Sequence, residues 1–294
     1  MERTHGMLQM MRTSYISSQD DIKDFSWRPL LNTYGSELNK EEVEKIEKET
    51  PKVFEYLILD KMNLSSAYNN ITQARENARA IQDHITKELW QCLNSYYHFI
   101  REPEIENHIK YGDPVTAIDL LIRNGLLFTG TVKNTMTRDE GYTFLHLGKF
   151  LERAIITTDI LRIKLNEIEP EGFHSVDARG LRYLLYSLFG YEIYMKTYKG
   201  HFSIEQVLEL VLYNPFFPHS IMYSMNQLNK YFERLKPDSL QENYEDLEFM
   251  IGKSLNNVKY SNLEAGNLQM LNQFLLKTRR YLIEIGNSFS RYYF

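Results

Sequence analysis

The stretch 137–165, TRDEGYTFLHLGKFLERAIITTDILRIKL, decides the fold of this chain. It predicts one long helix whose faces are nearly all apolar until the last turns, and a helix that is apolar all round is a buried one. Glu152 and Arg153 lie in the middle of it. Because a buried charge is costly unless it is paired and hydrogen-bonded, these two residues require partners or a function.

The rest of the chain also predicts helices. Valine is sparse and no segment alternates polar with apolar residues, so no strand is expected. Asn39 and Glu42 have the spacing of a capping box, and Pro51 can open a short helix that ends near Asp60. Further helices are expected over residues 1–18, 65–98, 116–127, 175–199, 204–213, 221–235, 244–255 and 263–292. The sequence therefore predicts an all-α, long-helix bundle.

The helix expected over residues 65–98 carries further charged candidates. No proline or glycine interrupts it, and its apolar residues recur at spacings of three and four, as on a core-facing stripe. Glu88 falls on that stripe, where an apolar residue is expected. Arg75 and Arg79 are one turn apart, and guanidinium groups suit anionic partners. We expect Arg75, Arg79 and Glu88 to be the partners of the central Glu-Arg pair.

Composition excludes several classes of protein. The formal net charge is -5, and there is no clustered basic surface of the kind that nucleic-acid binding needs. A single cysteine, Cys92, excludes an internal disulfide and a multi-cysteine zinc site. No run approaches the roughly 18 apolar residues of a membrane span, and the N-terminus does not read as a signal peptide. We expect a cytoplasmic protein that binds neither nucleic acid nor membrane, with its oligomeric state open.

The chain resembles itself at a nearly constant offset. Glu2-Arg3 corresponds to Glu152-Arg153, with Arg12 and Arg162 each nine residues after the arginine. The segment 27–31 matches 181–185, and Ser66 matches Ser220. These matches predict two weakly related halves, 1–136 and 137–294, that pack as one domain. The second half has residues 137–150 ahead of its Glu-Arg pair, whereas the first begins at the pair, so we expect the native product to start upstream of Met1.

Several motifs together resemble the alpha-E domain family, a bacterial all-helical group with a recurring Glu-Arg motif. They cover essentially the whole chain: Gly141-Tyr142, Gly148, Leu151-Glu152-Arg153-Ala154, Ala74-Arg75-Glu76-Asn77-Ala78-Arg79, Glu88-Leu89-Trp90 and Asn214-Pro215-Phe216-Phe217-Pro218-His219-Ser220. His219 departs from the family, which usually has arginine there, and Thr4 departs from a common alanine. The loss of that arginine puts an anion contact at position 219 in doubt.

The resemblance implies partners but no reaction. Family members are typically encoded beside an ATP-grasp ligase and a transglutaminase-like peptidase, which implies by association a role in the synthesis, modification or turnover of peptide or amide bonds. The resemblance itself implies no established activity and no cofactor.

Two interpretations of the charged residues remain open. Glu152 and Arg153 point about 100° apart on a helix, so each needs a partner elsewhere, while Gly148, one turn earlier, would let a neighbouring helix or a ligand approach the carboxylate. One interpretation is a buried salt-bridge network with Arg75, Arg79 and Glu88, repeated by Glu2 and Arg3. The other is a central cleft in which these charges bind a carboxylate, a phosphate or a peptide terminus.

Catalytic and metal motifs are missing from the sequence. The eight histidines show no metal-ligand spacing, no repeated Glu-x-x-His pair exists, and no nucleophile or nucleotide motif occurs. Cys92 lies on an apolar stripe, where a cysteine is more often core than nucleophile. We therefore expect a non-catalytic helical scaffold or binding subunit. The alternatives are an enzyme subunit or a small-ligand binder that uses a central Glu/Arg cleft.

Overall fold

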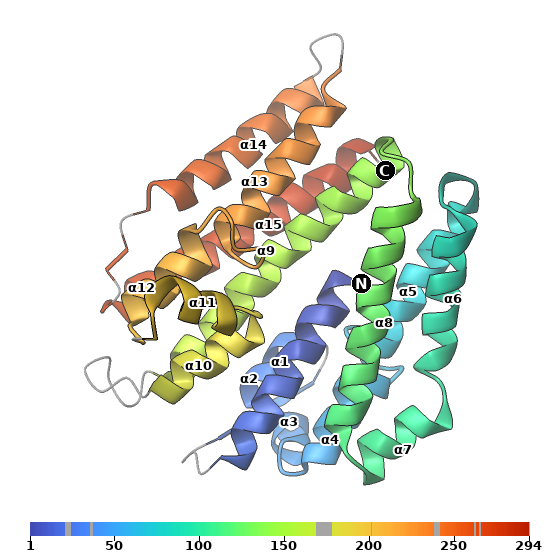
Figure 1. Ribbon diagram of the computed structural model, residues 1–294, viewed down its shortest axis with the longest axis vertical. Helices are drawn as coiled ribbons and strands as arrows, with labels where there is room; N and C mark the ends of the chain where they lie inside the picture. Colours follow the sequence, from blue (N-terminus) through green and yellow to red (C-terminus); the bar gives the residue numbers. More distant parts are fainter. Residues whose placement is uncertain are drawn as a thin grey trace. The chain divides into compact units, whose positions relative to one another are not determined.

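A computed structural model describes residues 1–20, 25–35, 38–168, 178–200, 202–237, 242–261, 263–264 and 266–293. Every regular element within these ranges is a helix, which confirms the all-α fold (Figure 1). The chain divides into two compact units, Met1–Thr137 and Arg138–Phe294. Each unit buries a set of apolar side chains, and the boundary lies beside the one that the sequence suggested.

The first unit is built around α8, Pro114–Thr135, which packs against α1, α6 and α7. Its other elements are α1 Glu2–Gln19, α2 Arg28–Tyr34, α3 Lys40–Ile46, α4 Thr50–Phe54, η1 Glu55–Leu59, α5 Ala67–Ala80, η2 Gln82–His84, α6 Lys87–Phe99 and α7 Pro103–Tyr111. The sequence predicted α8 too short and missed α7. Proline at the start of each helix supplies a fixed φ suited to the first turn.

Helix α8 has a membrane-like composition, and 28% of its most apolar 18-residue window is buried. Within the described residues it is the one helix long and apolar enough to cross a membrane, by length and composition only. Asp119 on α8 accepts from Arg12 Nε of α1 at 2.6 Å, and the carbonyl of Leu121 accepts from the Tyr96 hydroxyl of α6 at 2.8 Å. These bonds tie α8 to two neighbouring helices of its own unit.

The helix expected over residues 65–98 is interrupted, so that prediction is wrong. Helix α5 ends at Ala80, the short 3₁₀ turn η2 follows, and α6 begins at Lys87, where the Thr86 side chain accepts from the Leu89 amide at 3.2 Å. Helix α6 then packs back against α5. A continuous helix could not place its two halves against each other, so tertiary packing overrides the unbroken helical pattern.

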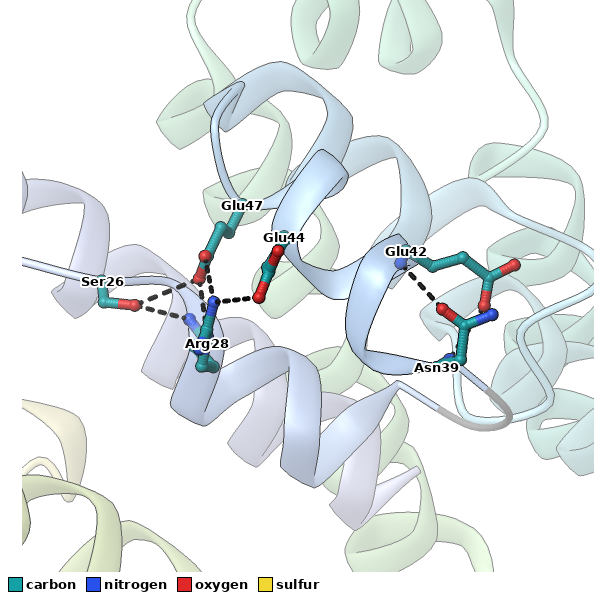
Figure 2. Close-up of polar contacts among 6 residues, drawn as sticks. All are labelled: Ser26, Arg28, Asn39, Glu42, Glu44 and Glu47. Carbon is teal, nitrogen blue, oxygen red and sulfur yellow. Dashed lines mark hydrogen bonds and ion pairs between the residues drawn. The ribbon is translucent and has the colours of Figure 1, made fainter.

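A surface cluster fastens α2 to the end of α3 (Figure 2). Arg28 donates to Glu47 through Nη2 at 2.6 Å and Nε at 3.2 Å, and Ser26 donates to the same carboxylate. The hydrogen bond from Arg28 lowers the pKa of Glu47. At the other end of α3, Asn39 accepts from the Glu42 amide at 3.0 Å while the Glu42 carboxylate accepts from the Asn39 amide at 2.8 Å, which confirms the predicted capping box.

The second unit is built around α9, Glu140–Ile168, the helix predicted from the opening stretch. It packs against α10, α13 and α15, and α13 and α15 run alongside it in Figure 1. Residues 154–161 are all buried, so this part of α9 is enclosed on every side, as its sequence predicted. The remaining elements are α10 Ala178–Ser187, α11 Tyr191–Tyr198, α12 Ile204–Leu208, η5 Glu209–Tyr213, α13 Ile221–Phe232, η6 Glu233–Leu235, α14 Glu242–Lys259 and α15 Leu268–Tyr293.

The helix expected over residues 175–199 is two helices, α10 and α11; residues 175–177 lie outside the described part. Phe189, between them, has a left-handed backbone with φ 55°, and the Gly190 amide donates to the Leu185 carbonyl at 2.8 Å. A Cβ on Gly190 would lie 3.0 Å from a ring atom of Phe217. The close approach of Phe217 therefore requires glycine at the break.

Two short π-helices recur at corresponding places in the two units. Helix α4 continues into η1 and helix α12 into η5, and the residues of η1 and η5 differ in number by 154, as do Ser66 and Ser220. Each π-helix ends with a backbone hydrogen bond. The Asp60 amide donates to the Glu55 carbonyl at 3.0 Å, and the Asn214 amide donates to the Glu209 carbonyl at 3.1 Å. The recurrence agrees with the offset found in the sequence, and the duplication itself stays a prediction.

Candidate functional site

Arg153 holds the backbone of a loop that begins some sixty residues later. Its Nη1 donates to the Pro218 carbonyl at 3.3 Å, and its guanidinium lies 5.7 Å from the ring centroid of Phe150. One turn further along α9, the Thr157 hydroxyl donates to the His219 carbonyl at 3.1 Å. One face of α9 therefore supplies two donors to two consecutive carbonyls of the loop.

The loop, residues 214–220, is also held by its own side chains. Asn214 Oδ1 accepts from the amides of Phe216 at 2.8 Å and Phe217 at 3.1 Å. The Ser220 hydroxyl donates to the Asn214 carbonyl at 2.5 Å and accepts from the Tyr223 amide at 2.9 Å, where it caps α13. These bonds fix the loop between the end of η5 and the start of α13.

Held in this way, the 214–220 loop buries one aromatic ring and exposes the next. Phe217 is 2% exposed and packs over Gly190, whereas Phe216 is 85% exposed. The His219 ring lies beside Phe189 and Phe217, at centroid distances of 5.3 and 6.1 Å. The sequence named this segment as a motif but did not indicate which phenylalanine faces outward.

Glu152 and Arg153 are half-buried on α9, and each has partners of its own. The more deeply buried carboxylate on this helix is Asp159, which the sequence analysis did not single out. Asp159 is 6% exposed and accepts from Arg279 Nε of α15 at 2.7 Å. Burial raises the pKa of Asp159, the charges of Arg279 and Arg162 act against that rise, and the charge of Glu152 adds to it. An acidic residue in the most apolar part of α9 was the signal that could have identified it.

Gly148 does not admit a neighbouring helix, contrary to expectation. It is exposed, and a Cβ there would meet no heavy atom within 4 Å. The close approach to α9 is instead made by α15, where a Cβ on Gly286 would lie 3.1 Å from a methyl carbon of Leu151. The glycine that matters for this packing is therefore on the facing helix.

In the first unit, Arg75 and Arg79 come together through a residue that the prediction omitted, Glu76. Arg75 Nη1 lies 2.5 Å and Arg79 Nη1 3.7 Å from its carboxylate oxygens. Arg75 also donates to Asn94 at 2.8 Å, and its guanidinium lies 4.5 Å from the ring centroid of Tyr97 on α6. The Arg75 contacts fasten α5 to α6.

Glu88 is exposed in the first turn of α6, so its expected place on a buried stripe is wrong. The stripe required the unbroken helix that η2 interrupts. Glu2 and Arg3 lie in the first turn of α1, half-buried and exposed respectively, and both have partners. A shared interior for both Glu-Arg pairs stays a prediction.

His146 lies in a column of aromatic rings between α9 and α13. Its ring stands 3.9 Å from that of Tyr142 and 4.7 Å from that of Tyr231. Its Nδ1 is 2.9 Å from the Tyr142 carbonyl, which can only accept, so Nδ1 carries the proton. Burial lowers the pKa of His146 to about 4, with Lys149, Arg138 and Arg234 acting in the same direction. The imidazole is neutral at neutral pH.

A pocket of about 700 Å³ opens at the start of α9. Arg138, Arg234 and Lys236 line it together with Asp139 and Glu140. The Arg138 guanidinium lies 4.3 Å from the Tyr142 ring and that of Arg234 4.8 Å from the Tyr231 ring. The two arginines are thus held by the rings that enclose His146.

Cys92 and the metal-binding side chains offer little for catalysis. Burial raises the pKa of the Cys92 thiol, which disfavours the thiolate that a nucleophile requires. Among the residues that the structure describes, no three His, Cys, Asp or Glu side chains are grouped to hold a metal ion. What the arginine of the motif does build, together with Thr157, is a support for the 214–220 loop.

Comparison with known proteins gives one match over the whole length of the chain. The model of the Alpha-E family, described as a predicted alpha-helical domain with a conserved ER motif, matches residues 1–294. The uncharacterized protein Mb2597 of Mycobacterium bovis is 23% identical over 159 residues, which are 51% of this chain and 17% of that protein. The uncharacterized protein Rv2567 of Mycobacterium tuberculosis is 22% identical over the same shares.

This chain therefore aligns with only a small part of these longer relatives. No solved structure matches it.

Proposed function

The chain belongs to the Alpha-E family, and we propose that it acts as a non-catalytic helical binding subunit in the cytoplasm. Its partners would be an ATP-grasp ligase and a transglutaminase-like peptidase, in a system that makes or modifies peptide or amide bonds. Two things support the proposal: the association with a ligase and a peptidase that the family resemblance implies, and the contact of Arg153 with the 214–220 loop.

One observation carries the proposal: the arginine of the motif supports an exposed aromatic side chain. Arg153 and Thr157 hold the carbonyls of Pro218 and His219, and the loop so fixed exposes 85% of Phe216. A rigid loop loses little conformational freedom when it binds. Exposed aromatic residues are the side chains that most often anchor a protein partner in a pocket.

The enzyme-subunit alternative has less support. Arg153 is committed to a backbone carbonyl, His146 has a pKa of about 4, and the pKa of Cys92 is raised by burial. A general base works best with a pKa near the operating pH. The properties of these side chains thus favour a scaffolding role over a catalytic one.

The test combines binding with turnover. The chain is mixed with the purified ligase and peptidase encoded beside it, and ligase turnover is measured with and without the chain. We expect a stable complex and faster turnover in its presence. Full turnover by the ligase alone, together with no complex, would contradict the proposal.

Variants then locate the contact. Phe216→Ser should weaken the complex at least tenfold, whereas Phe249→Ser, at a side chain on α14 that is 68% exposed, should leave it unchanged. Equal effects of the two substitutions would point to general surface hydrophobicity and would count against the loop.

A second candidate is a small-ligand binder that uses the pocket at the start of α9. The three cations that line it would attract a carboxylate or phosphate, and two of them are already positioned over aromatic rings. Titration calorimetry with inorganic phosphate tests this candidate. Phosphate binding that is lost in Arg234→Gln would favour this candidate. The absence of measurable heat up to about 10 mM phosphate, a concentration that would reveal millimolar affinity, would exclude it.

A further inference from the structure

A second pocket, of about 760 Å³, opens on the first unit beside the π-helix η1. This volume is within the range of small-molecule sites. The π-helix and the turn that follows it form one wall, and the end of α6 with the start of α7 forms another. The half-buried Leu59 contributes apolar surface, whereas Ile100 is 1% exposed and lies within the wall. π-helical turns occur often at functional sites, so the position of this pocket beside η1 favours a binding role.

One group of charges in the pocket is already satisfied. Lys110 Nζ lies 2.8 Å from a carboxylate oxygen of Glu55 on η1 and 2.8 Å from one of Glu106 on α7. The hydrogen bonds that Lys110 donates to these carboxylates raise its pKa. Lys52, at the rim, is paired with Glu49. These residues join elements together, and because one lysine is shared by two glutamates, the group keeps one net negative charge.

Two other cations lie near the ring of Tyr68. Lys61 Nζ lies 5.5 Å and the Arg101 guanidinium carbon 5.9 Å from its centroid. Arg101 also donates to the Tyr97 hydroxyl, which fixes its guanidinium, and the Lys61 carbonyl accepts from Asn69 at 2.8 Å, which fixes the backbone of that residue. In the described part of the chain, neither cation has a carboxylate within ion-pair distance.

Two carboxylates line the same pocket, each next in sequence to one of these cations. Asp60 accepts from the Met62 amide at 2.7 Å, and Glu102 is exposed at the start of α7. A purely anionic ligand would meet two attractive and two repulsive charges. A ligand that carries both signs would meet an opposite charge for each of its ends.

We propose that this pocket binds a free amino acid with an apolar side chain. Its carboxylate lies between Lys61 and Arg101, its ammonium faces Asp60 and Glu102, and its side chain rests on Leu59. This binding site is distinct from the 214–220 loop and does not depend on the function proposed for it.

Three probes of the same shape separate the charge requirements. L-leucine has both charges, N-acetyl-L-leucine has only the anion, and L-leucinamide has only the cation. Their affinities for the full chain are measured by ligand-observed NMR titration. We expect L-leucine to bind at least tenfold more tightly than either derivative. Equal affinities, or no saturable binding of L-leucine, would overturn the proposal.

Substitutions at the pocket provide a second, independent measurement. Arg101→Gln should weaken L-leucine at least fivefold and leave L-leucinamide unchanged, whereas Glu102→Gln should weaken L-leucine and leave N-acetyl-L-leucine unchanged. Arg123→Gln, at an exposed arginine on α8 outside the pocket, is the matched control and should change nothing. Circular dichroism checks that each variant is folded. Unchanged L-leucine affinity in both pocket variants would refute the assignment.

Discussion

At the scale of single residues, the charges on α9 are explained by the partners that each one meets. Arg153 reaches a backbone carbonyl, Asp159 meets Arg279, and the buried Lys164 lies 2.8 Å from Glu167. Leaving one of these charges without its partner would cost more than the pair contributes, because the remaining ion stays desolvated. The charged residues thus fix how neighbouring segments fit against the helix.

The Asp159–Arg279 pair allows a direct test of this explanation. Arg279→Met should lower the free energy of unfolding by about 2 kcal/mol at neutral pH, because the buried Asp159 carboxylate loses its charged donor. Arg280→Met, at the exposed neighbouring position on α15, should change it little. Urea unfolding of both variants provides the measurement, and equal losses would contradict a specific role for the pair.

His146 predicts a pH dependence with a definite sign. Its folded-state pKa of about 4 lies below the ordinary value of about 6.5, so the unfolded chain binds a proton more readily. The contribution of neutral His146 to the free energy of unfolding is therefore complete above pH 6.5. It is lost as the pH falls toward 4, by about 2 kcal/mol after allowance for partial exposure.

His146→Phe should remove this dependence. The unfolding free energy of the wild type minus that of the variant is measured in urea from pH 7 to about pH 4.5. This difference should become smaller as the pH is lowered. His84→Gln, at an exposed histidine in η2, is the control and should follow the wild type. A constant difference between wild type and His146→Phe would contradict the assigned cause.

At the scale of elements, packing decides where a helix breaks. Gly190→Ala should destabilise the chain by about 1–2 kcal/mol, because the added methyl group meets the Phe217 ring. Gly252→Ala, in the middle of α14, meets nothing within 4 Å and should stabilise it by about 0.5–1 kcal/mol. Thermal unfolding distinguishes the two directions, and the same sign for both variants would be inconsistent with this structure.

The helix positions were largely predictable, whereas the breaks were not. The apolar pattern of α9, the capping box at Asn39 and the helix opened by Pro51 follow from local rules, and all three are observed. The break between α5 and α6 has no proline or glycine to announce it. It exists because α6 packs back on α5, which is a tertiary effect. For the same reason the periodicity wrongly placed Glu88 in the core.

The candidate site was predictable in part. Arg153 could be singled out because it is a charge in an apolar helix, and Asp159 satisfied the same criterion. The contact of Arg153 with Pro218 depends on the packing of α9 against α13, which no spacing along the chain reveals. The exposure of Phe216 and the burial of Phe217 likewise follow from how the loop folds over Gly190.

At the scale of the whole molecule, the predicted duplication assigns equivalent roles to distant residues. Asp60 Oδ1 accepts from the Met62 amide at 2.7 Å, and Asn214 Oδ1 accepts from the Phe216 amide at 2.8 Å. Met62 and Phe216 are 82% and 85% exposed. The two units thus build the same type of turn after a π-helix and expose an apolar side chain at the same place.

Exchange of the two turn residues tests this equivalence. Asp60→Asn and Asn214→Asp keep the acceptor oxygen and should change the unfolding free energy little, whereas Asp60→Ala and Asn214→Ala should each lower it by about 1 kcal/mol. Denaturant unfolding of the four variants gives the comparison. If alanine is as well tolerated as the exchanged residue at either position, the two turns are not equivalent.

The central claim is that the arginine of the Glu-Arg motif, Arg153 on α9, holds the 214–220 loop. Hydrogen exchange at the Phe216 and Phe217 amides, followed by NMR, tests it most directly, because both amides donate to Asn214 within that loop. In Arg153→Met, exchange at these two amides should quicken about tenfold, the equivalent of about 1.4 kcal/mol, while amides of the buried part of α9 stay unchanged. Arg280→Met should leave the loop amides unaffected. Unchanged exchange at Phe216 and Phe217 in Arg153→Met would contradict the claim.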